Sequence, residues 1–366
     1  MKMVVFGLTV SSSWGNGHAT LWRGLIRALT ERGWSIVFFE HDVAYYAETR
    51  DLHEIRGGEL ILYQDWQEIL AVARRHLADA DVAVVTSFCP DGIAATELLA
   101  AWSDLLKIFY DLDTPVTLAA LSNGEASRTI GPRGLRDFDL VLSYTGGAAL
   151  AALKESLGAR CVMPLYGHVD PTVHRPSAAA ERFRSDLAYI GTYAQDRQEK
   201  LEELLVEPAR RQPRCRFLIA GAQYPQSFPW AQNIFFARHL PPAQHPEFYS
   251  SARLVLNVTR QAMAEAGWCP SGRLFEAAAC GAAIVTDPWP GLEEFFTPGR
   301  EILIASNAAD VIAALSLPDS DLRAIGANAR RRVLADHTSD RRAESLARMI
   351  GRFTQGAAAL DGAVAS

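Results

Sequence analysis

The segment at residues 270–281, PSGRLFEAAACG, combines residue types and spacing suited to binding a phosphorylated ligand. It predicts a helix start, because Ser271 can cap the first free amides and a glycine ends the segment. Gly272 lets a ligand approach the backbone, and free N–H groups at a helix start attract phosphate oxygens. Arg273 and Glu276 can project from one side, offering a forked donor to phosphate and an acceptor to sugar hydroxyls. Alternatively, the two form only a surface ion pair.

A second group of candidate residues follows the first predicted strand, at residues 3–7. Gly15 and Gly17, together with neighbouring serines, make a flexible turn that can wrap a ligand. His18 opens the helix predicted after this turn, where the positive end of the helix dipole favours a neutral ring that can accept a proton. The alternative is that His18 is an ordinary surface histidine of a first helical turn.

The spacing of Gly15 and Gly17 also invites comparison with a dinucleotide-binding fingerprint, since Glu40 or Asp42 follows a little over twenty residues later. However, the loop between the strand and the glycines is too long for that tight turn. Thr20 also stands where the fingerprint has its third small residue. A nicotinamide-dependent oxidoreductase is therefore disfavoured, and no cofactor is expected.

Two carboxylates follow the strand predicted at residues 106–110. Asp111 and Asp113 could bind an acceptor hydroxyl or serve as a general base, although paired acids also cap turns and helices. No nearby set of histidines and cysteines has the spacing of metal ligands. The sequence therefore predicts no metal site.

Further polar residues follow predicted strands in the second half of the chain. After residues 187–190, Gly191 allows close approach of a ligand, and Arg197 can neutralise a phosphate opposite the arginine of the first segment. Arg197 could instead pair only with a neighbouring acid. Asn257 and Arg260 end another strand and are secondary candidates.

Short β-rich runs alternate with helical patterns along almost the whole chain, which predicts parallel sheets covered by helices on both faces. The expected fold class is α/β, with two Rossmann-like doubly wound domains and a ligand in the cleft between them. A stretch rich in proline, near residues 163–176, marks the boundary. We expect domains at residues 1–165 and 166–340. Residues 341–366 then form a C-terminal helix, which packs back on the first domain, and a tail.

Composition limits the possible classes of protein. The chain has 366 residues, 49% of them apolar, and a net charge of −6, which argues against nucleic acid as a partner. Its five cysteines are an odd number without CxxC spacing, typical of free thiols in a reducing cytoplasm. No apolar stretch approaches the roughly 18 residues of a membrane span, and the first strand leaves no room for a signal peptide. We therefore expect a cytoplasmic protein without a transmembrane segment.

Three runs in the second half of the chain form a recognisable pattern: LNVTR at residues 256–260, PSGRLFEAAACG at 270–281 and TDPWPGLEEFF at 286–296. They resemble the CgeB-like glycosyltransferases, which are distantly similar to glycosyltransferase family 4. The linker GHVDP at 167–171 and the tail segment VLADHT at 333–338 also resemble that group. The resemblance covers about residues 160 to 345. It implies the two-domain GT-B architecture, with the acceptor on the N-terminal domain and a nucleotide-sugar donor on the C-terminal domain.

The resemblance also implies roles for particular residues. Glu276 would bind the ribose, and Arg197 and Arg273 would lie near the diphosphate, while His18 and its glycine loop would lie at the reacting centre. One position departs from the pattern, because family 4 enzymes often carry a second glutamate eight residues before the ribose glutamate, and here that residue is Trp268. The role of the missing carboxylate in binding the donor sugar is not carried over, and retaining or inverting stereochemistry stays open.

The sequence thus predicts a metal-independent transferase of the hexosyltransferase type. Its donor would be a nucleotide-diphosphosugar linked to UDP or dTDP, and its acceptor a sugar, lipid, peptide or small molecule. The alternatives are a GT-B-like nucleotide-sugar epimerase and a noncatalytic surface or spore-envelope assembly protein. The catalytic candidates are His18, Asp111 and Asp113, and the donor-binding candidates are Gly15, Gly17, Gly191, Arg197, Asn257, Arg260, Ser271, Gly272, Arg273 and Glu276.

Overall fold

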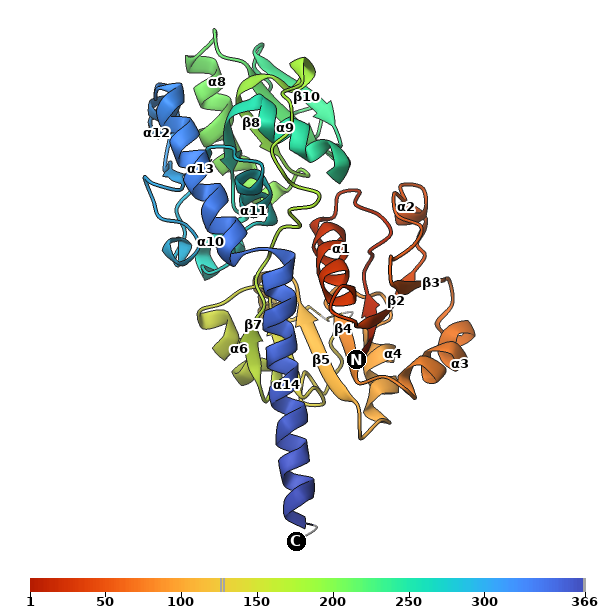
Figure 1. Ribbon diagram of the computed structural model, residues 1–366. Helices are drawn as coiled ribbons and strands as arrows, with labels where there is room; N and C mark the ends of the chain where they lie inside the picture. Colours follow the sequence, from red (N-terminus) through yellow and green to blue (C-terminus); the bar gives the residue numbers. More distant parts are fainter. Residues whose placement is uncertain (126, 128, 365–366) are drawn as a thin grey trace.

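The computed structural model describes residues 1–125, 127 and 129–364, and it shows an elongated molecule with two α/β lobes (Figure 1). Each lobe is built on its own parallel β-sheet, and we name the lobes the N-terminal and C-terminal domains. The predicted α/β class with two doubly wound domains is therefore confirmed. Residues 365 and 366, the end of the predicted tail, lie outside the described residues.

The N-terminal domain contains a seven-stranded sheet in which every neighbouring pair is parallel. In spatial order its strands are β3 (Gly58–Tyr63), β2 (Ser35–His41), β1 (Lys2–Gly7), β4 (Val82–Thr86), β5 (Leu106–Asp111), β6 (Leu140–Ser143) and β7 (Val162–Pro164). β4 is buried at every residue, which explains its continuous apolar run, since helices cover both faces of the sheet. Its helices are α1 (Gly17–Thr30), α2 (Ala44–Ala47), α3 (Trp66–Leu77), α4 (Gly92–Ala100), α5 (Thr114–Ser122) and α6 (Ala148–Leu157).

The C-terminal domain contains a six-stranded parallel sheet. Its spatial order is β10 (Ile234–Arg238), β9 (Phe217–Gly221), β8 (Ser185–Ile190), β11 (Ala252–Asn257), β12 (Ile284–Thr286) and β13 (Leu303–Ile304). One helical segment joins α7 (Gln198–Leu201), a π-helical turn (Glu202–Val206) and α8 (Glu207–Arg211). The other helices are α9 (His245–Ser251), α10 (Gln261–Ala266), α11 (Gly272–Ala279), α12 (Ala308–Leu315) and α13 (Asp319–Asp336), with single 3-10 turns at Glu181–Phe183, Gln195–Arg197, Pro242–Gln244 and Leu292–Glu294.

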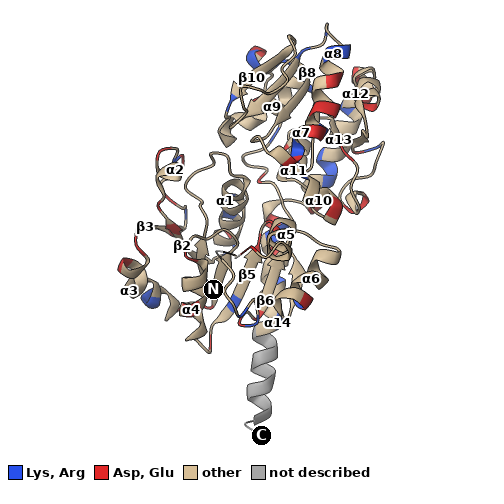
Figure 2. Cartoon of the chain, turned by 180° about the vertical axis from the view of Figure 1, so that it is seen from behind, with Lys and Arg blue, Asp and Glu red and all other residues tan. Residues whose placement is uncertain are grey.

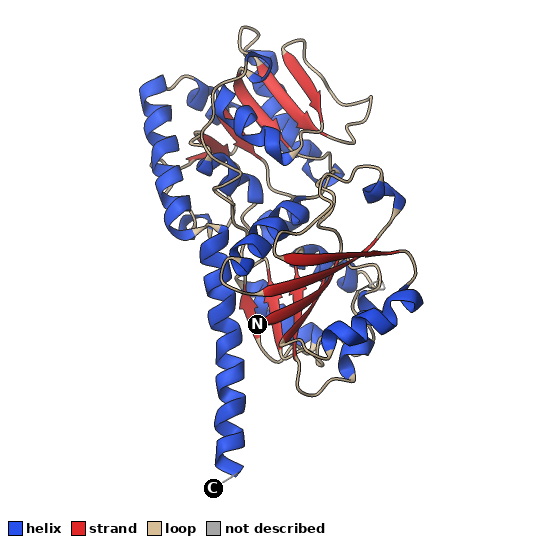
Figure 3. Ribbon diagram, turned by 45° about the vertical axis from the view of Figure 1, so that its right-hand side comes forward, coloured by secondary structure: helices blue, strands red, loops and turns tan. Residues whose placement is uncertain are grey.

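The chain passes between the domains twice, and the two crossings lie side by side. After α13 the chain returns and forms α14 (Ser339–Val364), the long helix beside the N-terminal sheet in Figure 3. The Val169 N–H donates to the His337 carbonyl at 3.0 Å, and the Ser339 N–H donates to the Val169 carbonyl at 2.8 Å. Ala343 and Ile350 of α14 are buried in the same apolar core as α1. The C-terminal helix therefore fastens the second crossing to the first domain.

No helix among the described residues has the length and apolar character that crossing a membrane requires. Figure 2 shows acidic and basic residues intermixed along the helices of the C-terminal domain, without one extended region of a single sign.

Candidate functional site

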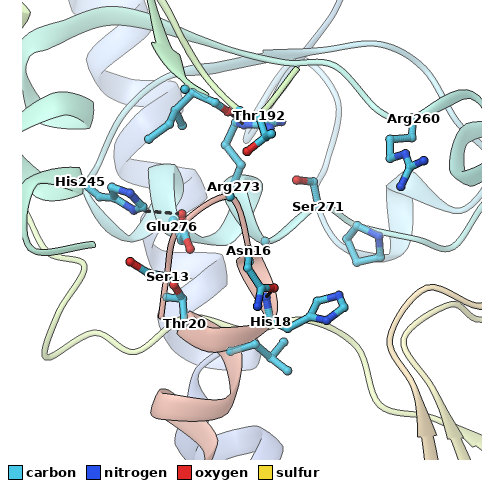
Figure 4. A pocket seen from close by; sticks show the side chains of 18 of the residues that line it. Ser13, Asn16, His18, Thr20, Thr192, His245, Arg260, Ser271, Arg273 and Glu276 are labelled. Atoms are coloured by element: carbon cyan, nitrogen blue, oxygen red, sulfur yellow. Dashed lines mark hydrogen bonds and ion pairs between the residues drawn. The ribbon is translucent and has the colours of Figure 1, made fainter. Parts of the chain in front are cut away.

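A cleft of about 340 Å³ lies between the domains, at the carboxyl ends of strands from both sheets. This is where open parallel sheets bind ligands. Figure 4 shows the loop before α1 on one wall and the start of α11 on the other. Asp111 and Asn257 do not line the cleft, but all the other residues predicted from the sequence do: Gly15, Gly17, His18, Asp113, Gly191, Arg197, Arg260, Ser271, Gly272, Arg273 and Glu276.

Arg273 is held in place by the ends of two strands. Its Nε donates to the Ile190 carbonyl, and its Nη1 donates to Asn257 Oδ1 at 2.5 Å. A Cβ atom on Gly191 would lie 2.8 Å from Arg273 Nη2, so only glycine leaves room for the guanidinium. Asn257, predicted to bind the donor, instead lies behind the cleft wall and positions Arg273.

The start of α11 is open to the cleft. Ser271 occupies the N-cap position but makes no side-chain capping bond within the described residues, which corrects the capping prediction. Its side chain lines the cleft with Gly272, where the nearest atom to an added Cβ would be the Tyr144 hydroxyl oxygen, 4.0 Å away. The first amides of α11 are therefore accessible to an anion.

Glu276 projects from α11 toward three polar side chains that the sequence motifs did not indicate. Its Oε2 accepts from the Tyr249 hydroxyl at 3.2 Å and lies 3.5 Å from His245 Nδ1 and 3.9 Å from His174 Nε2. Burial acts to raise the pKa of Glu276, but the two histidines outweigh it and lower this pKa to about 2. Arg273 and Glu276 thus have separate partners and form no ion pair in the part of the chain that the structure describes, which excludes the surface-pair alternative.

The two other arginines lie on the same wall. Arg197 Nη2 donates to the Thr192 carbonyl at 2.6 Å, and Arg260 Nε pairs with Asp196 at 2.8 Å. Asp196, the acid next to Arg197, therefore pairs with Arg260 rather than with Arg197. Both arginines line the cleft, so three guanidinium groups lie on this wall, of which Arg260 is paired with an acid.

On the opposite wall, His18 and Asp113 form a pair. His18 Nε2 lies 3.0 Å from Asp113 Oδ2, and the His18 N–H donates to Asn16 Oδ1, which caps α1. His18 Nδ1 is buried and has no hydrogen-bond partner among the described residues. The Asp113 carboxylate therefore orients the ring from the Nε2 side, as carboxylates do for histidines that act as general bases.

Asp111 does not reach the cleft, contrary to its predicted catalytic role. It is fully buried, and its Oδ1 accepts from the Asp113 N–H at 3.1 Å and from the Thr117 hydroxyl at 3.2 Å. Burial raises the pKa of Asp111 to about 6. Asp111 therefore shapes the turn that presents Asp113 to His18.

The loop before His18 is fixed by Glu40, which is fully buried at the end of β2. Its carboxylate accepts from the Thr9 hydroxyl at 2.7 Å, the Val10 N–H at 2.7 Å, and the Ser11 N–H and hydroxyl at 2.9 and 2.5 Å. Asp51 holds the next part of the loop, because it accepts from both the N–H and the hydroxyl of Ser13. Glu40 therefore holds the loop in place and is not available to bind the ribose of a dinucleotide, as the length of the loop also indicates.

Trp268 stands where family 4 enzymes often have a second glutamate, and it does not line the cleft. Its indole Nε1 donates to Glu294 at 2.7 Å, and its carbonyl accepts from the Gly146 N–H at 2.9 Å. A Cβ on Gly147 would lie 2.5 Å from the indole, so the ring packs directly on the N-terminal domain. Trp268 thus joins the two domains and supplies no acid to the cleft.

Comparison with known proteins agrees with this architecture. Residues 197–348, which include α11, match a family model described as "Glycosyl transferase-like". No curated protein sequence matches the chain. A sucrose-phosphate synthase structure from Thermosynechococcus elongatus is similar, with a TM-score of 0.74 and 14% identity over 97% of this chain and 100% of that one.

Two further solved structures are similar over nearly the whole chain. HepE of Anabaena, in complex with UDP and glucose, has a TM-score of 0.68 and 12% identity over 96% of this chain and 100% of that one. An alpha-glucosyltransferase in complex with UDP and DNA has a TM-score of 0.70 and 12% identity over 96% and 99%. The chain has the GT-B fold. Apart from Asp111 and Asn257, the candidate residues line both walls of the cleft between its two domains.

Proposed function

We propose that the protein is a glycosyltransferase that moves a sugar from a nucleotide-diphosphosugar to an acceptor bound in the cleft. One observation carries the proposal: a helix start with Arg273 and Glu276 faces the His18–Asp113 pair across a single cleft. The similar HepE structures are complexes with UDP-glucose, or with UDP and glucose. They support a UDP-linked donor here, with a dTDP-linked donor as the second choice.

On the C-terminal wall, the diphosphate is proposed to lie at the start of α11, between Arg273 and Arg197. Free amides and guanidinium groups there would stabilise the charge that develops on the departing diphosphate. Positive charge is thus supplied without a metal at the diphosphate. Glu276 Oε1, which makes no hydrogen bond to another described residue, would accept from the ribose hydroxyls.

On the N-terminal wall, His18 is proposed to take the proton of the acceptor hydroxyl. Asp113 lies 3.0 Å from His18 Nε2 and holds the ring in one orientation at the edge of the cleft. The fixed carboxylate also stabilises the imidazolium that forms after proton transfer. Gly15 and Gly17 would let the acceptor and the donor sugar approach the loop closely.

The kind of enzyme, its acceptor and its location are proposed from the motifs, the cleft and the composition. The motifs in residues 256–296 favour a CgeB-like enzyme, and transfer of a hexose to a sugar, lipid, peptide or small molecule fits the size of the cleft. The net charge of −6 and the intermixed acidic and basic residues in Figure 2 disfavour nucleic acid as the acceptor, although one similar structure contains DNA. Five free cysteines favour a cytoplasmic location, where thiols stay reduced.

Calorimetric titration with UDP, dTDP, GDP and ADP tests the donor site first. We expect UDP or dTDP to bind most tightly, and binding of none of the four would contradict the proposal. Incubation with the matching nucleotide sugar and a panel of acceptors, followed by mass spectrometry, then tests transfer. An isomerised nucleotide sugar without a transfer product would indicate an epimerase, and nucleotide binding without any turnover would indicate a noncatalytic assembly protein.

A further inference from the structure

Two histidines and a carboxylate converge at one end of the cleft, from three separate parts of the chain. His174 lies in the first crossing between the domains, His245 begins α9, and Glu276 lies in α11. The facing atoms are His174 Nε2, His245 Nδ1 and Glu276 Oε2, and their separations are 3.3, 3.5 and 3.9 Å. Tetrahedral bonds of about 2.0–2.2 Å to zinc hold ligand atoms about 3.3–3.5 Å apart. The cluster therefore has nearly the dimensions of a zinc site.

The orientation of His245 leaves a lone pair directed into this cluster. Its Nε2 lies 3.1 Å from the Leu240 carbonyl, which can only accept, so Nε2 carries the hydrogen. In the neutral ring, Nδ1 then bears a lone pair and faces the ionised oxygen of Glu276. Two such acceptors at 3.5 Å require a proton or a metal ion between them. A histidine ligand that donates its other N–H to a backbone carbonyl is the usual support around a bound metal.

His174 contributes a second nitrogen. Its side chain is fully buried, and its Nε2 lies 3.3 Å from His245 Nδ1 and 3.9 Å from Glu276 Oε2. One proton shared between the two rings could explain their contact, but it would leave the 3.9 Å approach of His174 to Glu276 without a role. A single ion bound by all three atoms would account for the approach of all three pairs, although the 3.9 Å separation is longer than the zinc spacing.

We propose that His174, His245 and Glu276 bind a divalent transition-metal ion of the zinc class. Two imidazoles and one carboxylate suit zinc better than magnesium or calcium, which prefer oxygen ligands only. His245 and Glu276 line the cleft, so an ion can enter and a fourth position stays open to it. Because Glu276 Oε2 faces the ion, Oε1 stays free for a nucleotide, and the ion would fix the carboxylate in that orientation.

The test uses the full-length protein after treatment with a chelator, and contains no nucleotide. Zn²⁺ is titrated by calorimetry, and Co²⁺ is added to a second sample so that its visible absorption reports the coordination. We expect one equivalent of metal and a tetrahedral cobalt spectrum. His174→Gln and His245→Gln should each weaken Zn²⁺ binding more than about 100-fold. Loss of a residue that only hydrogen-bonds to a ligand typically weakens binding about 10- to 100-fold. His239→Gln is the matched control, because His239 also lines the cleft but lies outside the cluster.

Three results would overturn the proposal: no binding of Zn²⁺ by the unmodified protein, binding that survives both substitutions, or an equal loss in the His239→Gln control. Circular dichroism and thermal unfolding check the fold of each variant. If the buried His174→Gln variant unfolds, the partly exposed His245→Gln variant decides alone. Since no nucleotide is present, failure here would leave the proposed sugar transfer untouched, and failure of transfer would leave the metal site untouched.

Discussion

The two walls of the cleft reach a fixed geometry in different ways. On the C-terminal wall, one helix start carries Ser271, Gly272, Arg273 and Glu276, and strand ends clamp its arginine. On the N-terminal wall, His18 follows an irregular loop whose backbone hydrogen bonds end on the buried carboxylate of Glu40. A helix orients its own side chains, whereas a loop needs distant partners to do so.

This difference suggests how the two walls respond to change. Substitutions on the C-terminal wall should act locally, on binding of the nucleotide, because α11 is supported by a buried core. Substitutions under the N-terminal loop should act at a distance, on the placement of His18. Measurements that separate affinity for the donor from turnover can therefore test the comparison.

The largest effect is expected for His18→Ala. Loss of a general base should lower kcat by about 10²- to 10⁴-fold. Affinity for the nucleoside diphosphate should stay unchanged, because the diphosphate is proposed to lie on the other wall. Steady-state kinetics and calorimetry measure the two quantities, and His53→Ala, at an exposed position of the same domain, serves as the control. Unchanged kcat in the His18 variant would remove this residue from the reaction.

The next effect is expected for Arg273→Ala, which removes the central cation of the C-terminal wall. Affinity for UDP or dTDP should fall by about 1–3 kcal/mol, the cost of losing one hydrogen bond to a charged group. Arg300→Ala, an exposed arginine of the same domain, should bind as the unmodified protein does. Equal affinity in the Arg273 and Arg300 variants would show that the diphosphate lies elsewhere.

The fold and one wall of the site could be predicted from sequence because their signals are local. The alternation of strands and helices shows the parallel sheets, and residues 270–281 contain a complete helix start. Asp111 and Asn257 lie at the strand ends where the sequence predicts them. A side chain at a strand end can point either into the cleft or behind its wall. Sequence spacing does not distinguish these directions, and the structure places both behind the wall.

The residues around Glu276 could not be predicted, since they meet only in the folded chain. His174, His245 and Tyr249 come from a linker and from α9, far in sequence from α11. The same holds for Glu40, whose four hydrogen bonds cross about thirty residues. An isolated acid after a strand carries no signal for such a role, except that a buried carboxylate must find donors.

Glu40→Gln tests whether the loop before His18 on the N-terminal wall depends on the buried Glu40 carboxylate. The amide keeps one acceptor oxygen but turns an NH₂ group toward backbone donors, so the free energy of unfolding should fall by about 1–2 kcal/mol. Turnover should also fall, because the loop before His18 loses its fixed shape, while nucleotide affinity should change little. Denaturant unfolding and kinetics measure these effects beside Glu48→Gln, at an exposed position. If nucleotide affinity fell as much as turnover, the N-terminal wall would also take part in binding the nucleotide, contrary to the proposal.

The smallest effect concerns His168, which lies between the walls at the first crossing and bonds Ser339 at 3.0 Å. Burial, followed by the charges of Arg342 and Arg27, lowers the pKa of His168 to about 3, although Asp340 acts in the opposite direction. Below about pH 6.5 the unfolded chain binds a proton at this ring and the folded chain does not, so acid favours unfolding. Between about pH 7.5 and 5.5 the free energy of unfolding should therefore fall by about 1 kcal/mol through this group alone.

His168→Asn should remove that part of the pH dependence, since an amide placed near Nδ1 can still bond Ser339 but does not titrate. The slope of unfolding free energy against pH is the measurement, because it is independent of any constant loss of stability from the substitution. His53→Asn, at an exposed position of the same domain, is the matched control and should keep the full slope. If the slope of unfolding free energy against pH were unchanged in the His168 variant, the folded protein would accept a charged ring at this crossing, and the prediction would be wrong.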